Sequence, residues 1–176
     1  MELHERETAI ELLKDSRQRV LAAVSGLSGE QLTFRLAEDQ WSVSDCLEHI
    51  NVVEASVYAA IQRTLSRPPR PEKRAEAAGK LEIVQRALAD RGRKLAGPPE
   101  MMPRRERIEF SELVMEFERI RAATLAFTAE TSSDLHDYFF PHLFFGTMDC
   151  YQWLMLLGWH ADRHIAQMEE VKAAHG

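Results

Sequence analysis

The chain has 176 residues, of which 45% are hydrophobic and 28% are charged, proportions typical of a soluble globular protein with one substantial core. Its formal net charge of −6 argues against nucleic-acid binding, which needs clustered positive charge to displace counterions. No apolar run approaches the length of a membrane span, and the charged N-terminal residues are not those of a signal peptide. We therefore predict a single cytoplasmic domain over residues 1–176, with neither a membrane nor a nucleic acid as partner.

The first part of the chain is predicted to form two long helices, because apolar residues recur there at helical spacing. One helix spans about Leu3–Ser25 and is followed by a short crossover. The other begins after Trp41 and ends at about Leu65. Its N-cap is Ser42 or Ser44, since serine is a favoured capping residue. No stretch of the chain has the sustained alternation that is typical of a strand.

Residues 67–107 are predicted to be one long connection. Within it only Lys80–Asp90 has helical spacing. Prolines, which cannot continue a helix, lie near both of its ends: Pro68, Pro69, Pro71, Pro98, Pro99 and Pro103. Because bundle helices are usually joined by about two to eight residues, a segment of this length is expected to cross the bundle or to cover one end of it.

The last part of the chain is predicted to form two more helices. They span about Ile108–Thr131 and about Met148–Ala173, and the turn-rich segment Ser132–Gly146 separates them. Four amphipathic helices with one long connection predict an all-α fold, a four-helix bundle with a crossover between its second and third helices.

Three histidines lie on the predicted inward faces of these helices. His160 and His164 are four residues apart, which places both imidazoles on one helix face, one turn apart, within reach of the same ion. His49 lies on the inward face of the second helix. A buried histidine costs free energy unless both ring nitrogens have partners, and one metal ion would explain all three positions. If the two helices meet, three neutral ligands leave a fourth position open, which is typical of a reactive metal centre.

The two cysteines are too few for a disulfide framework, and one of them suggests a different metal site. Cys46 lies three residues before His49 and could complete a closed, structural zinc site. A lone cysteine on an apolar stripe is more often a packing residue, which is what we expect of Cys46. A zinc-protease site is disfavoured, because Ala161 stands where the general-base glutamate of such a protein would lie.

Other residues are candidates for the surroundings of a metal. Trp153 and Phe117 could line a pocket over it, and His142 could lie at the mouth of that pocket. A ligating histidine is commonly oriented by a carboxylate that accepts its second N–H, and spacing does not choose among four candidates: Asp45, Glu48, Asp149 and Asp162. Asp149, in the first turn of the fourth helix, is favoured as a cap. The remaining histidines give no signal, and no catalytic residue is assigned: His4, His136 and His175.

Several segments together resemble the DinB superfamily, in its DinB-like domain branch. They are Trp41-Ser42 with His49 eight residues beyond the tryptophan, Pro141-His142 followed by Gly146, and Tyr151-Gln152-Trp153 leading into His160–Met168. The resemblance implies an up-down-down-up bundle, a divalent transition metal, usually zinc or nickel, held by His49, His160 and His164, and a frequent homodimer. Related proteins include S-transferases and isomerases that use low-molecular-weight thiols such as bacillithiol and mycothiol, so the resemblance does not imply one function.

These observations predict a metal-dependent enzyme that acts on a small molecule. The preferred hypothesis is an S-transferase whose open metal site binds a low-molecular-weight thiol as thiolate. A close variant is a hydrolase in which the metal activates water. The alternative from another class is a non-catalytic metal-binding bundle, a stress-response or small-molecule-binding protein.

Overall fold

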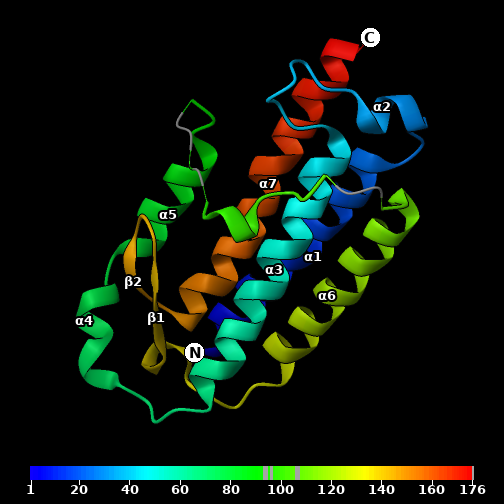
Figure 1. The fold of residues 1–176 in the computed structure, drawn as a ribbon. Helices are drawn as coiled ribbons and strands as arrows, with labels where there is room; N and C mark the ends of the chain where they lie inside the picture. The colour runs from blue at the N-terminus through cyan, green and yellow to red at the C-terminus, as the bar shows by residue number, and fades with distance from the viewer. Residues whose placement is uncertain (93–94, 96, 106–107, 176) are drawn as a thin grey trace.

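The computed structural model describes residues 1–92, 95, 97–105 and 108–175, and Figure 1 shows their arrangement. Its described residues contain four long helices: α1 (Leu3–Val24), α3 (Val43–Leu65), α6 (Phe110–Glu130) and α7 (Cys150–His175). In Figure 1, α1 and α7 run upward while α3 and α6 run downward. Helix α1 packs against α6 and α7, and α3 packs against the same two helices. The all-α, up-down-down-up four-helix bundle predicted from the sequence is confirmed.

Short elements join the long helices. They are α2 (Gly29–Thr33), a 3-10 turn η1 (Pro71–Lys73), α4 (Arg74–Ala77), α5 (Lys80–Ala89), η2 (Pro99–Met101), η3 (Leu135–Asp137), β1 (Phe139–His142) and β2 (Gly146–Asp149). Within the described ranges, no helix combines the length and the apolar character that a membrane crossing needs.

The long connection between α3 and α6 lies along one side of the bundle. Its helix α5 packs against α7, and η2 packs against α3. Arg163 of α7 fastens the end of α5, donating hydrogen bonds to the carbonyl oxygens of Leu88 (3.0 Å) and Asp90 (2.7 Å). Residues 93, 94, 96, 106 and 107 of the predicted connection lie outside the described residues.

The start of α3 is set by a reciprocal cap. The Ser42 hydroxyl accepts a hydrogen bond from the Asp45 backbone N–H (3.1 Å), and the Asp45 carboxylate accepts one from the Ser42 N–H (2.9 Å). Of the two predicted caps, Ser42 therefore takes the role. The Ser44 hydroxyl instead donates to the carbonyl oxygen of Leu32 in α2. Because this cap determines where α3 begins, it also determines which face of the bundle His49 meets.

A β-hairpin occupies the segment that was predicted to be turn and helix. Strands β1 and β2 pair antiparallel, with Phe140 opposite Met148, so α7 begins at Cys150 and not at Met148. Gly146 at the turn has a φ of +66°, a conformation that favours glycine. The Phe140 ring stacks on Trp153 of α7 with centroids 4.4 Å apart. The strands carry no alternating pattern because they are short and are stabilised by packing on α7.

The core contains a buried ion pair that the sequence pattern did not predict. Arg121 of α6 is 0% exposed and Glu54 of α3 is 2% exposed. Two parallel hydrogen bonds of 2.8 and 2.7 Å join the guanidinium to the carboxylate. The guanidinium also donates to the Leu13 carbonyl and the Ser16 hydroxyl of α1, both at 2.7 Å. One arginine thus satisfies its donors by linking three helices of the bundle.

Candidate metal centre

The fold brings His49, His160 and His164 together between α3 and α7. The Nε2 atom of His160 lies 3.1 Å from that of His49 and 3.2 Å from that of His164. One potential ligand atom from each residue lies within 4.8 Å of the other two. Bonds of about 2.0–2.1 Å at tetrahedral angles hold neighbouring donor atoms about 3.4 Å apart, so this spacing fits a single transition-metal ion.

Hydrogen bonds at the far side of two rings aim their Nε2 lone pairs at the common centre. His49 Nδ1 donates to the carbonyl oxygen of Met101 in η2 (2.6 Å), and His164 Nδ1 donates to the side-chain oxygen of Gln167 (3.1 Å). Burial lowers the pKa of each of the three histidines, which keeps the rings neutral. Because the Nδ1 atoms of His49 and His164 carry their ring protons, only His160 can carry a proton on Nε2. A cation would satisfy the remaining Nε2 lone pairs. Neutral imidazoles suit divalent transition metals such as zinc, copper, iron and nickel.

Trp41 covers one side of the histidine cluster. Its ring stacks on His164 with centroids 5.5 Å apart and 23° between the planes, and its centroid lies 4.7 Å from that of His49. The sequence singled out Trp41 only as part of the family resemblance. The structure supplies a physical role, because a large ring at this position closes one approach to the cluster.

A pocket of about 910 Å³ opens on another side of the cluster, and His49 and His160 form part of its wall. Two residues expected near a metal do line it, namely Trp153 and His142. Burial lowers the pKa of His142 to about 4, so this ring is neutral at physiological pH. Phe117 was expected to line the same pocket but lies in the bundle core, 1% exposed. Its helix α6 packs on the faces of α1 and α3 and contributes no residue to this wall.

The four carboxylates considered as partners of the ligating histidines all have other partners. Asp45 caps α3 and pairs with Arg35, Glu48 accepts the backbone N–H groups of Arg104 and Arg105, Asp149 caps α7, and Asp162 pairs with Arg19. The expected role of Asp149 as a cap is therefore observed.

The groups that orient the rings are a backbone carbonyl, from Met101, and a side-chain amide, from Gln167. Every residue has a carbonyl, so the sequence contains no signal for Met101, which is 52 positions from its partner His49. Gln167 lies one helical turn beyond His164, where the spacing could have identified it. Glu48 supports this arrangement, because its bonds to residues 104 and 105 fasten the connection just beyond Met101.

Cys46 is a core residue. It is 0% exposed and packs in an apolar cluster that includes Val43 and Leu47. Burial raises the pKa of its thiol, which favours the protonated form. Among the described residues that could bind a metal, the histidine cluster contains no cysteine or carboxylate. The geometry therefore favours the open three-histidine arrangement over the closed one.

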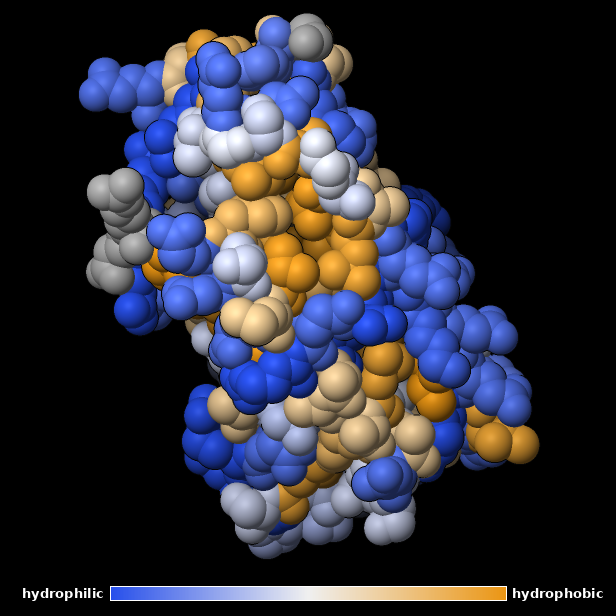
Figure 2. Space-filling view, turned by 90° about the vertical axis from the view of Figure 1, so that its right-hand side faces the viewer, coloured by the Kyte–Doolittle hydropathy of each residue, from blue (hydrophilic) through white to orange (hydrophobic). Residues whose placement is uncertain are grey.

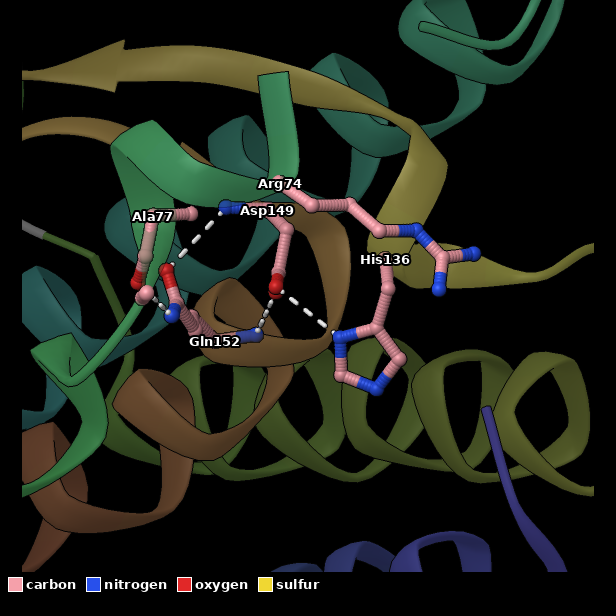
Figure 3. A pocket seen from close by; sticks show the side chains of 6 residues that line it. Arg74, Ala77, His136, Asp149 and Gln152 are labelled. Atoms are coloured by element: carbon pink, nitrogen blue, oxygen red, sulfur yellow. Dashed lines mark hydrogen bonds and ion pairs between the residues drawn. The ribbon is translucent and has the colours of Figure 1, made fainter. Parts of the chain in front are cut away.

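A second polar cluster lies at the N-terminal end of α7 and was not predicted. His136 of η3 bridges Asp149 at 2.9 Å and Glu5 of α1 at 3.1 Å. Figure 3 shows His136 and Asp149 at a small pocket of about 290 Å³, where Asp149 also accepts the Gln152 N–H (2.7 Å). The hydrogen bond to Asp149, with that to Glu5, raises the pKa of His136 to about 9. Glu5 is 131 positions away in the chain, so spacing carries no signal for this bridge.

We expect the folded state to lose stability as the pH rises through about 9. The raised pKa of His136 means that the folded chain holds this proton more tightly than the unfolded chain, where the pKa is near 6.5. The contribution is therefore complete below pH 6.5 and lost above pH 9. After allowance for solvent screening at this half-buried group, it amounts to about 1–2 kcal/mol. Urea unfolding of the wild type and His136→Gln across this interval measures the difference, and a difference independent of pH would contradict the assignment.

Comparisons with known proteins bear on this arrangement. A family model of the DinB superfamily matches residues 12–168, a range that includes all three histidines. The uncharacterised protein YuaE of Bacillus subtilis (strain 168) is 24% identical over 161 residues, which are 92% of this chain and 95% of YuaE. A solved structure of YfiT from Bacillus subtilis, described as a probable metal-dependent hydrolase with an unusual four-helix bundle topology, has a TM-score of 0.72 at 15% identity, over 100% of this chain and 90% of YfiT. The resemblance carried by Trp41, His49 and the segment His160–Met168 is thus confirmed across most of the sequence, and the chain belongs to the DinB superfamily.

Proposed function

We propose that this protein is a divalent-metal-dependent enzyme that acts on a small molecule, with His49, His160 and His164 as the metal ligands. The observation that carries the proposal is the convergence of three Nε2 atoms where His49 and His160 meet a pocket of about 910 Å³. A structural site would be closed by a fourth protein ligand, and none joins the cluster among the described residues. The description of YfiT, which has the same fold, as a probable metal-dependent hydrolase supports the proposal.

The chain's own residues prepare this site for chemistry. The Met101 carbonyl and the Gln167 amide hold two rings in the orientation that a ligand needs, and Trp41 blocks one approach. The largely apolar pocket wall beside the histidines would lower the local polarity and so strengthen electrostatic interactions there. When bound, a divalent ion such as zinc or nickel supplies a Lewis acid that lowers the pKa of a coordinated thiol or water molecule.

Within this class we propose thiol S-transfer as the reaction. Among the described residues that line the pocket there is no aspartate or glutamate to act as a general base. A low-molecular-weight thiol does not need one, because it loses its proton to solvent when it binds as thiolate. Its sulfur would then form a bond to carbon of the electrophilic substrate, and the bond from that carbon to the leaving group would break.

Hydrolysis is the second candidate, and one observation favours it. His142 lines the same pocket and is neutral, because burial lowers its pKa to about 4. Its Nδ1 atom accepts the backbone N–H of Phe144 (3.0 Å), so its Nε2 atom carries the ring proton and would donate a hydrogen bond to the substrate oxygen that becomes negative when water attacks. Loss of hydrolytic activity in His142→Ala, with metal content unchanged, would support this candidate over S-transfer.

A calorimetric titration tests the thiol proposal. The thiols to be titrated are cysteine, glutathione, bacillithiol and mycothiol. We expect at least one of them to bind the metal-loaded protein more tightly than the metal-free protein. Binding should release about one proton near neutral pH, because free thiols are mostly protonated there and the thiolate is the ligand. Titrations in buffers of different ionisation enthalpy measure that proton. Equal affinity with and without metal for every thiol would remove S-transfer.

We also propose that the protein is a homodimer, as the family resemblance implies. On the face at the right of Figure 1, where α2 and α6 lie, an apolar patch bordered by hydrophilic residues is seen in the upper half of Figure 2. Such a patch is typical of a surface that another protein covers. Light scattering of the purified protein measures its mass in solution, and a monomer at micromolar concentration would contradict the proposal.

A further inference from the structure

One stripe of α3 runs the length of the pocket beside the histidine cluster. His49, Val53, Ser56, Ala60 and Arg63 follow one another at intervals of four, three, four and three residues, and all five line this pocket. This spacing keeps them on one helix face. At 1.5 Å per residue, Arg63 lies about 21 Å from His49 along the helix axis. The pocket is therefore elongated, with the imidazoles at one end and a guanidinium at the other.

Between these two ends the walls are apolar. The other elements that form the pocket contribute mainly aliphatic and aromatic side chains, among them Leu88, Leu95, Met101, Phe140, Trp153 and Leu156. A wall of this kind binds the hydrocarbon part of a ligand, because burial of apolar surface is the main favourable contribution. A volume of about 910 Å³ is large for a small polar thiol alone.

The charge of Arg63 is not compensated within the pocket. Its side chain is exposed, and its guanidinium makes no hydrogen bond or ion pair with any described residue. No acidic side chain occurs among the described residues that line the pocket. A guanidinium matches the geometry of a carboxylate or phosphate, with which it forms two parallel hydrogen bonds.

We propose that the substrate is an elongated, largely apolar molecule that carries a carboxylate or phosphate group at the end remote from the reacting atoms. Arg63 binds this anionic group, the apolar walls bind the body, and the reacting end lies at His49 and His160. The position of the reacting end rests on the proposed function. The binding of the anionic end rests only on the pocket and on Arg63.

A fluorescent chain tests the anionic end directly. The probes are dansylaminoundecanoate and its uncharged carboxamide, titrated into the chelator-treated protein, where the charge of the probe can be recognised only by protein residues. We expect Arg63→Gln to weaken binding of the carboxylate about tenfold, the size of a lost charge-assisted hydrogen bond, and to leave binding of the carboxamide unchanged. Arg67→Gln removes an exposed cation that does not line the pocket and should change neither affinity.

Two further results complete the test. Ala60→Trp, which fills the pocket between its two ends, should weaken both probes. Equal losses for carboxylate and carboxamide in Arg63→Gln, equal losses in Arg63→Gln and Arg67→Gln, or no binding of either probe would overturn the proposal. A third probe, dodecanedioic acid monohydroxamate, tests the binding of the anionic end by Arg63 separately from the proposed metal site. Its hydroxamate should gain affinity when zinc or nickel is restored, whereas its dependence on Arg63 should be present without metal.

Discussion

Replacing His160 and His164 together by alanine is expected to abolish metal binding and, with it, any metal-dependent activity. The wild-type protein is expected to carry about one divalent transition metal per chain, because its three Nε2 atoms converge on one point. The double variant keeps a single imidazole of the three and leaves the ion without a chelating pair. Elemental analysis of both proteins after dialysis measures the loss. Stoichiometric metal in the double variant would contradict the assignment.

Two variants are controls for this result, and a third tests the hydrogen bond that orients His164. His142→Ala removes a histidine of the same pocket that is not in the cluster, and it should keep the metal. Cys46→Ser should also keep it, and the cobalt-substituted wild type should lack a sulfur-to-metal charge-transfer band. Gln167→Leu removes the hydrogen-bond acceptor of His164, together with a longer contact to Arg91 (3.5 Å), and should weaken metal binding about 10- to 100-fold. A sulfur band that disappears in Cys46→Ser would replace the open site by a closed one.

Breaking the buried pair of Glu54 and Arg121 is expected to destabilise the folded protein strongly. Glu54→Leu leaves the Arg121 charge buried without its partner, which should lower the free energy of unfolding by about 3–5 kcal/mol. Combining Glu54→Leu with Arg121→Met removes both charges and should recover a large part of this loss. Urea unfolding of the single and double variants measures the change in the free energy of unfolding in each case.

The exposed pair of Arg119 and Glu116 on α6 provides a matched control. These side chains form a similar two-bond contact of 2.7 and 2.8 Å, but they are 68% and 45% exposed. Arg119→Met should therefore change the free energy of unfolding by less than about 1 kcal/mol. A cost in Glu54→Leu no larger than that of Arg119→Met would mean that burial does not set the energy of the inner pair.

The positions of the long helices could be predicted because the signals for them are local. Helical periodicity and a capping serine depend on residues within a few positions of one another. The end of α3 at Leu65 was placed correctly, and its cap is one of the two serines that the sequence offered, Ser42. The start of α7 was predicted at Met148, whereas the helix begins at Cys150. The residues before Cys150 pair with β1, whose Phe140 stacks on Trp153, and this pairing outweighs their capacity to extend the helix.

The sequence by itself determined that this protein is a four-helix bundle and that His160 and His164 share one face of one helix, because the spacing of residues along a helix determines which side chains lie together. Only the tertiary structure decided that His49 meets them and that Met101 and Gln167 orient two of the rings. The same holds for the contact of Arg121 with Glu54 and for the uncompensated charge of Arg63. These features depend on which distant segments pack against one another, and burial then sets the strength of each polar contact.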